Sequence, residues 1–276
     1  MKIEKIEPTK KAIIIGASSD IGAALYNDWK KKKWDVVGTY RTLSDSVHNI
    51  KKKNTNLFEC DLSDVKSIEQ ASSSLNKSIS HWDVLVFGPG LQEPVELFSD
   101  CDFEKWESSI NVNFTSQLRL LHRLLKNRNK KKESHPSVLF FAGGGVNNAP
   151  INYSAYTISK IALIKMVELL AAEIEDVKFL IVGPGWVKTK IHQSVLDAGE
   201  RAGHSYSLTK KKFRDNDFVP MSKVVQCCNK LILGPKEIFT GRNYSVTNDE
   251  WDNPGFQELL KNNPDMYKLR RFLNNI

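Results

Sequence analysis

Cysteine, long apolar runs and acidic charge are all scarce in this sequence. Its 276 residues include four cysteines, too few and too irregularly spaced for a disulfide scaffold or a zinc site. No apolar run approaches the roughly 20 residues that a membrane-spanning helix needs. Residues 1–11 are charged and contain no signal-peptide core. We therefore expect a cytoplasmic protein that binds no metal and is neither secreted nor anchored in a membrane.

Basic side chains outnumber the acidic ones. The 40 Lys and Arg residues against 32 Asp and Glu leave a net charge of +8, which could attract nucleic acid or phosphorylated small molecules. The lysines stand in blocks near the ends of expected elements, and no aromatic-rich RNA-binding motif accompanies them. This pattern favours a solvated surface, so no nucleic-acid partner is expected.

The order of the apolar segments predicts an α/β fold. Hydrophobic residues make up 41% of the chain and charged residues 26%, as in soluble globular proteins. Strands are expected at residues 12–15, 34–40, 56–60, 84–87, 138–141 and 177–182. Helices are expected at residues 21–29, 106–125 and 155–174. Strands that are apolar throughout, with helices between them, are typical of a Rossmann-like, doubly wound parallel sheet covered on both faces.

Two segments fall outside this pattern. Residues 188–220 form the longest stretch without a clear strand, and loops of that size are usually lids or substrate loops. In the region of residues 186–220, the candidate wall residues, with simple packing as the alternative, are Trp186, His192, Tyr206 and Phe213. The tail at residues 248–276 is a C-terminal extension. No linker or internal repeat divides the chain, so residues 1–276 are expected to form one domain.

A glycine turn lies directly between the first expected strand and the first expected helix. Gly16 permits a sharp turn, and Gly22 allows the helix to pack closely on the sheet. Backbone N–H groups at the helix N-terminus can bind a pyrophosphate, although an ordinary strand–helix turn is the alternative. The residues expected around the phosphates are Gly16, Ser18, Ser19, Asp20, Ile21 and Gly22.

The end of the second expected strand bears on the choice of coenzyme. NAD-binding proteins place an acidic residue near this point to hold the ribose hydroxyls. This chain has Arg41 instead, and a guanidinium suits the 2′-phosphate of NADP. NADP(H) is therefore favoured over NAD(H). Asp61, after the third strand, could accept a hydrogen bond from the adenine amino group or, equally, could cap a helix N-terminus.

A tyrosine and a lysine stand four residues apart on an expected helix. Tyr156 and Lys160 therefore share one face of that helix. A neighbouring ammonium favours the phenolate and lowers the pKa of a tyrosine, as proton exchange near neutral pH requires. Tyr153 lacks such a partner, because Thr157 occupies the corresponding position.

Taken in order, these motifs resemble the short-chain dehydrogenase/reductase family over most of the chain. Besides the glycine turn, Asp61 and the Tyr156/Lys160 pair, the matching segments are residues 110–113, which end at Asn113, residues 184–189 and residues 240–242. The resemblance implies hydride transfer between a nicotinamide and a small carbonyl compound or secondary alcohol. It also implies a homodimer or homotetramer built through the helices at residues 106–125 and 155–174.

The resemblance further implies a role for each matching residue. Tyr156 is the expected general acid or base, and Lys160 is expected to lower its pKa and hold the nicotinamide ribose. Asn113 is expected to anchor a water of the proton relay through a local backbone distortion. Thr189 is expected to contact the cofactor near its carboxamide. The other residues expected to bind the cofactor are Leu62, Gly88, Gly90, Pro184, Gly185 and Val187.

The sequence departs from the family pattern at several positions. The family's catalytic serine lies about 12 to 14 residues before the tyrosine, where this chain has Ala142 followed by three glycines. Backbone N–H groups of the glycines, or Ser154 or Asn147, could replace the serine hydroxyl. Asp20 replaces a glycine of the phosphate turn. After the fourth strand, Gly90 is expected to keep the close approach of the backbone to the cofactor.

These departures leave three interpretations open. The first is an NADP-dependent oxidoreductase with Tyr156 as general acid/base. The second is a catalytically impaired NADP-binding or regulatory protein, and the third a nicotinamide-using sugar epimerase or dehydratase. The glycine triplet and the long tail also resemble a branch of the family linked to bacterial surface polysaccharide and sugar-nucleotide pathways.

Overall fold

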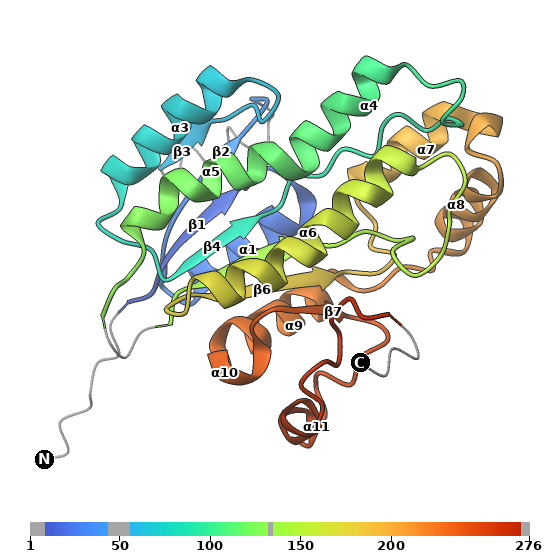
Figure 1. Cartoon of the computed structure of the whole chain (residues 1–276). Coiled ribbons are helices and arrows are strands. Elements are labelled where there is room, and N and C mark those ends of the chain that lie inside the picture. Colours follow the sequence, from blue (N-terminus) through green and yellow to red (C-terminus); the bar gives the residue numbers. More distant parts are fainter. Residues whose placement is uncertain (1–8, 44–55, 132–134, 272–276) are drawn as a thin grey trace, which may run out of the picture.

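A seven-stranded parallel sheet forms the centre of the molecule in the computed structural model, which describes residues 9–43, 56–131 and 135–271 (Figure 1). The strands are β1 (Lys11–Ile15), β2 (Asp35–Tyr40), β3 (Leu57–Glu59), β4 (Val84–Phe87), β5 (Ser137–Phe141), β6 (Lys178–Gly183) and β7 (Arg242–Ser245). Their order in the sheet is β3-β2-β1-β4-β5-β6-β7. The strand order reverses between β1 and β4, and ligands of such sheets bind at the carboxyl edge beside this point. The predicted single α/β domain is confirmed.

Helices cover both faces of the sheet. One face packs against α1 (Asp20–Lys31) and α9 (Met221–Leu233), and the other against α3 (Val65–Ser78), α5 (Ser116–Leu124) and α6 (Ser154–Glu173). Alternate residues of a strand face opposite sides. Ala12 and Ile14 accordingly belong to the first core, whereas Ile13 and Ile15 belong to the second. The strands are therefore apolar throughout because both of their faces are buried.

The expected helix at residues 106–125 is interrupted in the structure. It comprises α4 (Phe103–Ile110), a π-helical turn η1 (Asn111–Thr115), α5 and a short 3-10 turn η2 (Leu125–Asn127). The Ser116 amide donates to the Asn111 carbonyl five residues earlier, which defines the wide π turn. Such turns are frequent at functional sites. The distortion surrounds Asn113, the residue at which the sequence predicts one.

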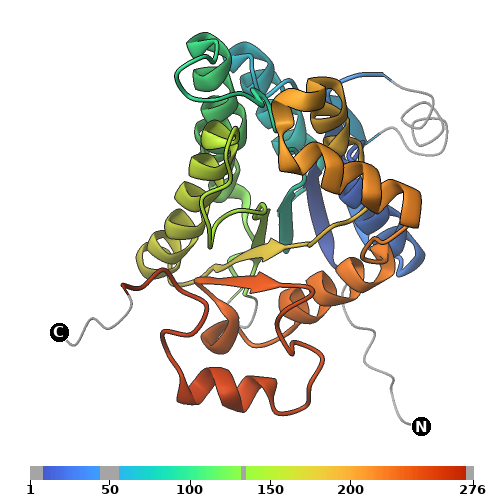
Figure 2. The same ribbon diagram turned by 90° about the vertical axis from the view of Figure 1, so that its right-hand side faces the viewer.

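Residues 188–220 were expected to form a loop, and this expectation is wrong. The segment folds into η3 (Lys190–His192), α7 (Gln193–Ala198), η4 (Gly199–Ala202) and α8 (His204–Asp215). We call residues 190–215 the lid. Gly199 and Gly203 flank η4 with φ angles of +58° and +54°, which L side chains rarely adopt. Figure 2 shows α7 and α8 lying across the carboxyl edge of the sheet.

The C-terminal extension packs beside β7. It follows α10 (Lys236–Phe239) and includes α11 (Phe256–Asn262). The buried Arg242 guanidinium donates to backbone carbonyls of Ile238, Leu260, Asn263 and Met266, so it ties both segments to the edge strand. No helix within the described parts of the chain is long and apolar enough to cross a membrane.

Candidate active site

The glycine turn brings backbone close to backbone at the carboxyl ends of β1 and β4. Gly16 has a φ of +72°, and a Cβ there would lie 2.8 Å from the Pro89 ring. A Cβ on Gly22 would lie 2.3 Å from the Gly16 carbonyl oxygen. Ser19 caps α1 by accepting a hydrogen bond from the Gly22 amide at 3.1 Å. The turn therefore brings the N-terminus of α1 to the carboxyl edge of the sheet, a position that suits a phosphate group.

Asp20 connects this turn to the lid. Its carboxylate lies in the first turn of α1 and accepts a hydrogen bond from the Lys190 backbone amide at 2.8 Å. The two residues are far apart in the sequence, and no motif predicts the contact. A carboxylate thus lies at the helix end where a pyrophosphate is expected, and it holds the first residue of the lid there.

The two residues expected at the adenosine end differ in their surroundings. Arg41 is exposed immediately after β2, at the carboxyl end of that strand. Asp61 accepts hydrogen bonds from the Ser63 amide and hydroxyl at 2.8 and 2.7 Å. The helix-cap interpretation of Asp61 is wrong, because Asp64 caps α3. Leu62, the next expected contact, is buried.

Gly88, directly after β4, packs against the glycine turn. A Cβ on Gly88 would lie 2.7 Å from the Ser19 hydroxyl, which is closer than real Cβ contacts. At Gly90 the nearest atoms would be Ile191 Cδ1 at 3.5 Å and Lys160 Nζ at 3.9 Å, which are ordinary contacts. Packing within the protein therefore requires a glycine at Gly88, and the approach of the backbone at Gly90 to the cofactor stays a prediction.

Tyr156 and Lys160 lie together at the carboxyl edge of the sheet. Both side chains are buried, and Lys160 Nζ is 5.6 Å from the centre of the Tyr156 ring. Lys160 Nζ donates a hydrogen bond of 3.0 Å to the carbonyl of Phe141, the last residue of β5. The tyrosine ring lies directly over Gly143, just beyond β5. The pair therefore lies beside the crevice where the fold binds ligands.

Burial controls the ionisation of both groups. It raises the pKa of Tyr156 to about 12 and lowers the pKa of Lys160 to about 8. The sequence predicted a lowered tyrosine pKa, so the structure corrects its direction. The lysine ammonium donates to a backbone carbonyl, and burial therefore dominates over its attraction for a phenolate. At neutral pH the phenol keeps its proton, as a proton donor must.

Asn113 fixes the backbone next to the crevice. Its side chain is fully buried, and it accepts from the Leu91 amide at 2.8 Å and donates to the Leu91 carbonyl at 2.6 Å. It also donates to the Ser109 hydroxyl at 3.3 Å. Both ends of the amide are thus used to hold the segment after β4 against the π turn η1.

Packing explains why the first residue of the glycine triplet, Gly143, is a glycine. A Cβ on Gly143 would lie 2.5 Å from Tyr156 Cε1 and 2.6 Å from its hydroxyl oxygen, whereas a Cβ on Gly144 would meet nothing within 4 Å. Neither side chain proposed as a serine substitute points inward. The Ser154 hydroxyl accepts from the Trp106 indole at 3.0 Å, and Asn147 is exposed. The backbone of the triplet remains the candidate for contact with the substrate oxygen.

The segment after β6 leads into the lid. Gly185 has a φ of +76°, Val187 is buried, and Pro184 and Thr189 are partly exposed. The wall residues Trp186, His192 and Phe213 pack on one another, with Trp186 and His192 stacked at 5.0 Å, while Tyr206 contacts a separate apolar cluster. His192 Nε2 lies 2.8 Å from the Val187 carbonyl, and burial lowers its pKa. His192 thus packs at the base of the lid.

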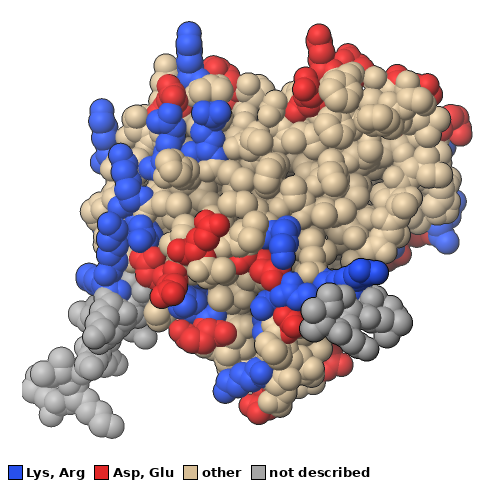
Figure 3. All heavy atoms as spheres, viewed as in Figure 1, with Lys and Arg blue, Asp and Glu red and all other residues tan. Residues whose placement is uncertain are grey.

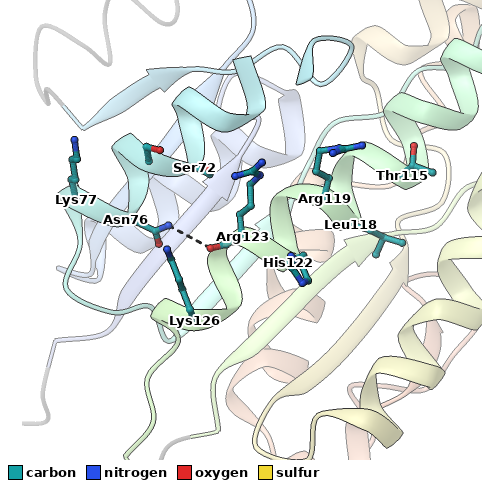
Figure 4. A pocket seen from close by; sticks show the side chains of 10 residues that line it. Ser72, Asn76, Lys77, Thr115, Leu118, Arg119, His122, Arg123 and Lys126 are labelled. Carbon is teal, nitrogen blue, oxygen red and sulfur yellow. Dashed lines mark hydrogen bonds between the residues drawn. The ribbon is translucent and has the colours of Figure 1, made fainter. Parts of the chain in front are cut away.

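A hollow of about 900 Å³ on the outer surface, between α3 and α5, is not this site (Figure 4). Its lining residues are Ser72, Ser73, Asn76, Lys77, Thr115, Leu118, Arg119, His122, Arg123 and Lys126. Several of its cations lie in the last turns of α3 and α5, where they complement the helix dipoles. Figure 3 shows Lys and Arg side chains projecting from the surface over α3 and α5, as expected for a solvated surface.

Sequence motifs did not identify the partners that position the site. Thr39 accepts from the Gly16 amide at 2.9 Å, and Phe141 and Leu91 supply the backbone groups that hold Lys160 and Asn113. Lys190 contributes only its amide. Any residue can supply a backbone amide or carbonyl, so no residue type in the sequence marks these partners. Only their place in the segment that follows each strand could have indicated them.

A doubly wound sheet with a glycine turn between β1 and α1 is typical of proteins that bind nucleotides. The family model described as short chain dehydrogenase matches residues 10–199. The chain belongs to this family.

Two curated relatives cover most of the chain. An uncharacterised oxidoreductase of Schizosaccharomyces pombe is 25% identical over 86% of this chain and 96% of its own length. A 3-oxoacyl-[acyl-carrier-protein] reductase of Buchnera aphidicola is 29% identical over 71% of this chain and 79% of its own length. Neither name points to surface-polysaccharide or sugar-nucleotide chemistry.

Solved structures share the fold. A short-chain dehydrogenase/reductase from Saccharomyces cerevisiae has a TM-score of 0.76 at 23% identity, over 90% of this chain and 99% of its own. A 4-hydroxyisoleucine dehydrogenase complexed with NADH has a TM-score of 0.72 at 21% identity, covering 86% and 96%. An actinorhodin polyketide ketoreductase with NADPH has a TM-score of 0.73 at 20% identity, covering 86% and 95%.

Proposed function

We propose that the protein is an NADP-dependent oxidoreductase that reduces a carbonyl compound, with Tyr156 as the proton donor. The observation that carries this proposal is the buried Tyr156/Lys160 pair beside the crevice at the carboxyl edge of the sheet. At neutral pH the phenol holds the proton that a new alcohol needs. Oxidation of an alcohol requires the phenolate, which is scarce at neutral pH.

The residues present fit a dinucleotide. The glycine turn leaves room that a Cβ would fill, and the N-terminus of α1 offers amides to a pyrophosphate. When bound, a nicotinamide supplies the hydride. Lys160 would hold the nicotinamide ribose, Thr189 would contact the carboxamide, and Asn113 would keep the adjoining backbone in place for a proton relay.

Polarisation of the substrate carbonyl is assigned to the glycine triplet. A preorganised donor near a developing oxyanion can contribute about 3 kcal/mol to lowering the barrier. Because Tyr156 occupies the space above Gly143, the backbone amides after β5 are the groups left to donate beside the phenol. This arrangement would replace the hydroxyl of the family's serine.

The coenzyme assignment predicts the effect of reversing charge at Arg41. An Arg41→Glu variant should raise the dissociation constant for NADPH by about 10- to 100-fold, because it replaces a guanidinium beside the 2′-phosphate by a repelling carboxylate. The value for NADH should change by less than about threefold. Titration of coenzyme fluorescence measures both, and Arg119→Glu on α5 is the matched control. Equal losses for the two coenzymes would remove the assignment.

The Asp20 carboxylate predicts a gain of affinity. An Asp20→Asn variant should bind NADPH about tenfold more tightly, since it removes a negative charge from the pyrophosphate end and keeps an oxygen acceptor for the Lys190 amide. Calorimetric titration tests this. Glu104→Gln, an acidic residue in the first turn of α4, is the control and should have no effect. Weaker binding by Asp20→Asn would mean that the carboxylate does not face the phosphates.

The lowered pKa of Lys160 predicts a pH dependence. Below about pH 8 the lysine is charged, so kcat/KM for carbonyl reduction should be flat at neutral pH. Above pH 8 the ammonium loses its proton, and kcat/KM should fall. Initial rates between about pH 6 and pH 10 measure the profile of the free enzyme. A profile that stays flat to about pH 9.5 would show that the charged lysine is not required.

Two further points concern the oligomeric state of the protein and its branch of the family. We propose a homo-oligomer formed through α4 and α6, because Phe103, Ile158 and Leu169 on these helices are exposed apolar residues. Figure 3 shows few charged side chains over this face. The basic part of α5 would repel a second copy, so it is left outside the interface. The relatives give no support to a sugar-nucleotide branch, and the proposal does not include it.

A catalytically impaired coenzyme-binding protein is the second candidate. The observation that favours it is the combination of Asp20 at the phosphate turn with the absence of a serine before the tyrosine. Tight NADPH binding without turnover of any ketone in a broad panel would support it over the reductase.

A further inference from the structure

The underside of the lid is apolar where it meets the rest of the site. Val195, Ala198, Ala202 and Tyr206 of the lid pack against Val95 and Tyr153. Tyr153 is the N-cap of α6, three residues before Tyr156 at the start of that helix. This cluster therefore forms the wall next to the proton-donating phenol.

A row of exposed apolar residues continues this wall to the surface. Leu97, Phe98 and Ile151 are 49%, 62% and 71% exposed. The Glu96 amide donates to the Asn152 carbonyl at 3.0 Å, so these residues come from two segments that are joined at the site. We call Leu97, Phe98 and Ile151 the apolar rim. Contiguous exposed apolar residues on a soluble protein commonly mark a binding surface.

The polar contacts of the lid lie beside this wall and hold the lid in place. Arg201 forms an ion pair with Glu96, and its carbonyl accepts from the Asn152 side chain at 2.7 Å. Within the described residues, the lid contributes one buried polar side chain, Thr209, and Tyr153 adds a buried hydroxyl to the wall. A sugar or a nucleotide needs several polar partners, more than these two hydroxyls supply. In Figures 1 and 2 the lid lies beside the loops that lead into α4 and α6.

We propose that the substrate carries an aliphatic chain that lies along this wall, from Tyr153 beneath the lid to the apolar rim. The inference rests on the proposed function, since it places the reacting carbonyl at Tyr156. It adds the chemical class of the rest of the substrate: a chain of methylene groups, long enough to leave the crevice between Leu97 and Ile151. The lid would open at Gly199 and Gly203 to admit it.

A homologous series of methyl ketones tests this proposal. The KM should fall about two- to fourfold for each added methylene until the chain reaches the rim, because each buried methylene contributes transfer free energy. The kcat should change little, since the added contacts are equal in the ground and transition states. A KM that is independent of chain length would overturn the proposal and leave the reductase assignment intact.

Variants of the rim locate the chain. A Leu97→Ser/Ile151→Ser double variant should raise KM for the longest ketone by about tenfold and leave that of the shortest unchanged. A Leu233→Ser/Leu259→Ser double variant changes two exposed leucines elsewhere and should alter neither. If the rim variant converts an oligomer to a monomer in sedimentation without changing the dependence on chain length, the rim is a self-association surface and the proposal is wrong.

Direct binding separates this inference from the proposed function. Calorimetric titration of 2-alkanols of increasing length needs no turnover, and affinity should rise with length in the wild type and less steeply in the rim variant. If no ketone is reduced but the alcohols show this dependence, the reductase assignment fails and the aliphatic site stands. If ketones are reduced and neither KM nor alcohol affinity depends on length, the aliphatic site alone fails.

Discussion

A Tyr156→Phe variant should lower kcat for carbonyl reduction by about a thousandfold and change the dissociation constant of NADPH by less than about threefold. The buried phenol is the proton donor that we propose, and a positioned general acid contributes about 10²- to 10⁴-fold to a rate. Removing only the hydroxyl keeps the aromatic ring over Gly143, so the fold and the coenzyme site should persist. Stopped-flow single turnovers and a coenzyme titration measure the two quantities.

Tyr153→Phe is the matched control for this prediction. Tyr153 is the N-cap of the same helix and contacts the lid cluster, so its variant should keep kcat within about threefold. Equal losses for the two variants would mean that the phenol of Tyr156 has no special part in the reaction.

Restoring a serine at Gly143 should lower activity instead of raising it. A side chain there would place its Cβ 2.5 to 2.7 Å from Tyr156 Cε1, Cζ and hydroxyl oxygen, so the ring would have to move away from Lys160. We expect Gly143→Ser to reduce kcat/KM by at least about a hundredfold, because catalysis depends on the exact position of the donor.

Gly144→Ser provides the matched comparison. A Cβ at Gly144 meets nothing within 4 Å, so this variant should fold normally and keep kcat/KM within about fivefold. Assays of both variants on the same ketone, with thermal melting to check folding, decide the matter. Higher activity of Gly143→Ser than of wild type would show that the chain is a family member that has simply lost its serine, and would contradict the packing described here.

The fold was largely predictable from the sequence because its strands are buried on both faces. The expected strands at residues 12–15, 84–87 and 138–141 agree with β1, β4 and β5 to within one residue. The lid was not predictable as helices, because α8 is strongly polar and carries three consecutive lysines. Its helical structure depends on tertiary contacts, such as those of Val195 and Ala202 with Tyr153, that no local pattern reveals.

The sequence predicted which residues lie together at the site, but it did not predict the direction in which their pKa values shift. Spacing alone placed Tyr156 and Lys160 on one face, and the family resemblance indicated the distortion at Asn113. The direction of the tyrosine pKa depends on how deeply the ring is buried and on where the lysine ammonium donates, and the sequence encodes neither. The contact between Asp20 and the Lys190 amide likewise arises only when the lid folds over the glycine turn.

Transfer of deuterium from coenzyme labelled at nicotinamide C4 to a ketone tests the central claim most directly. Mass spectrometry of the product should find one deuterium on the new alcohol carbon with wild-type protein, and almost none in the same time with Tyr156→Phe. An unlabelled alcohol, or the same yield of labelled alcohol from both proteins, would contradict a direct hydride transfer completed by this buried phenol.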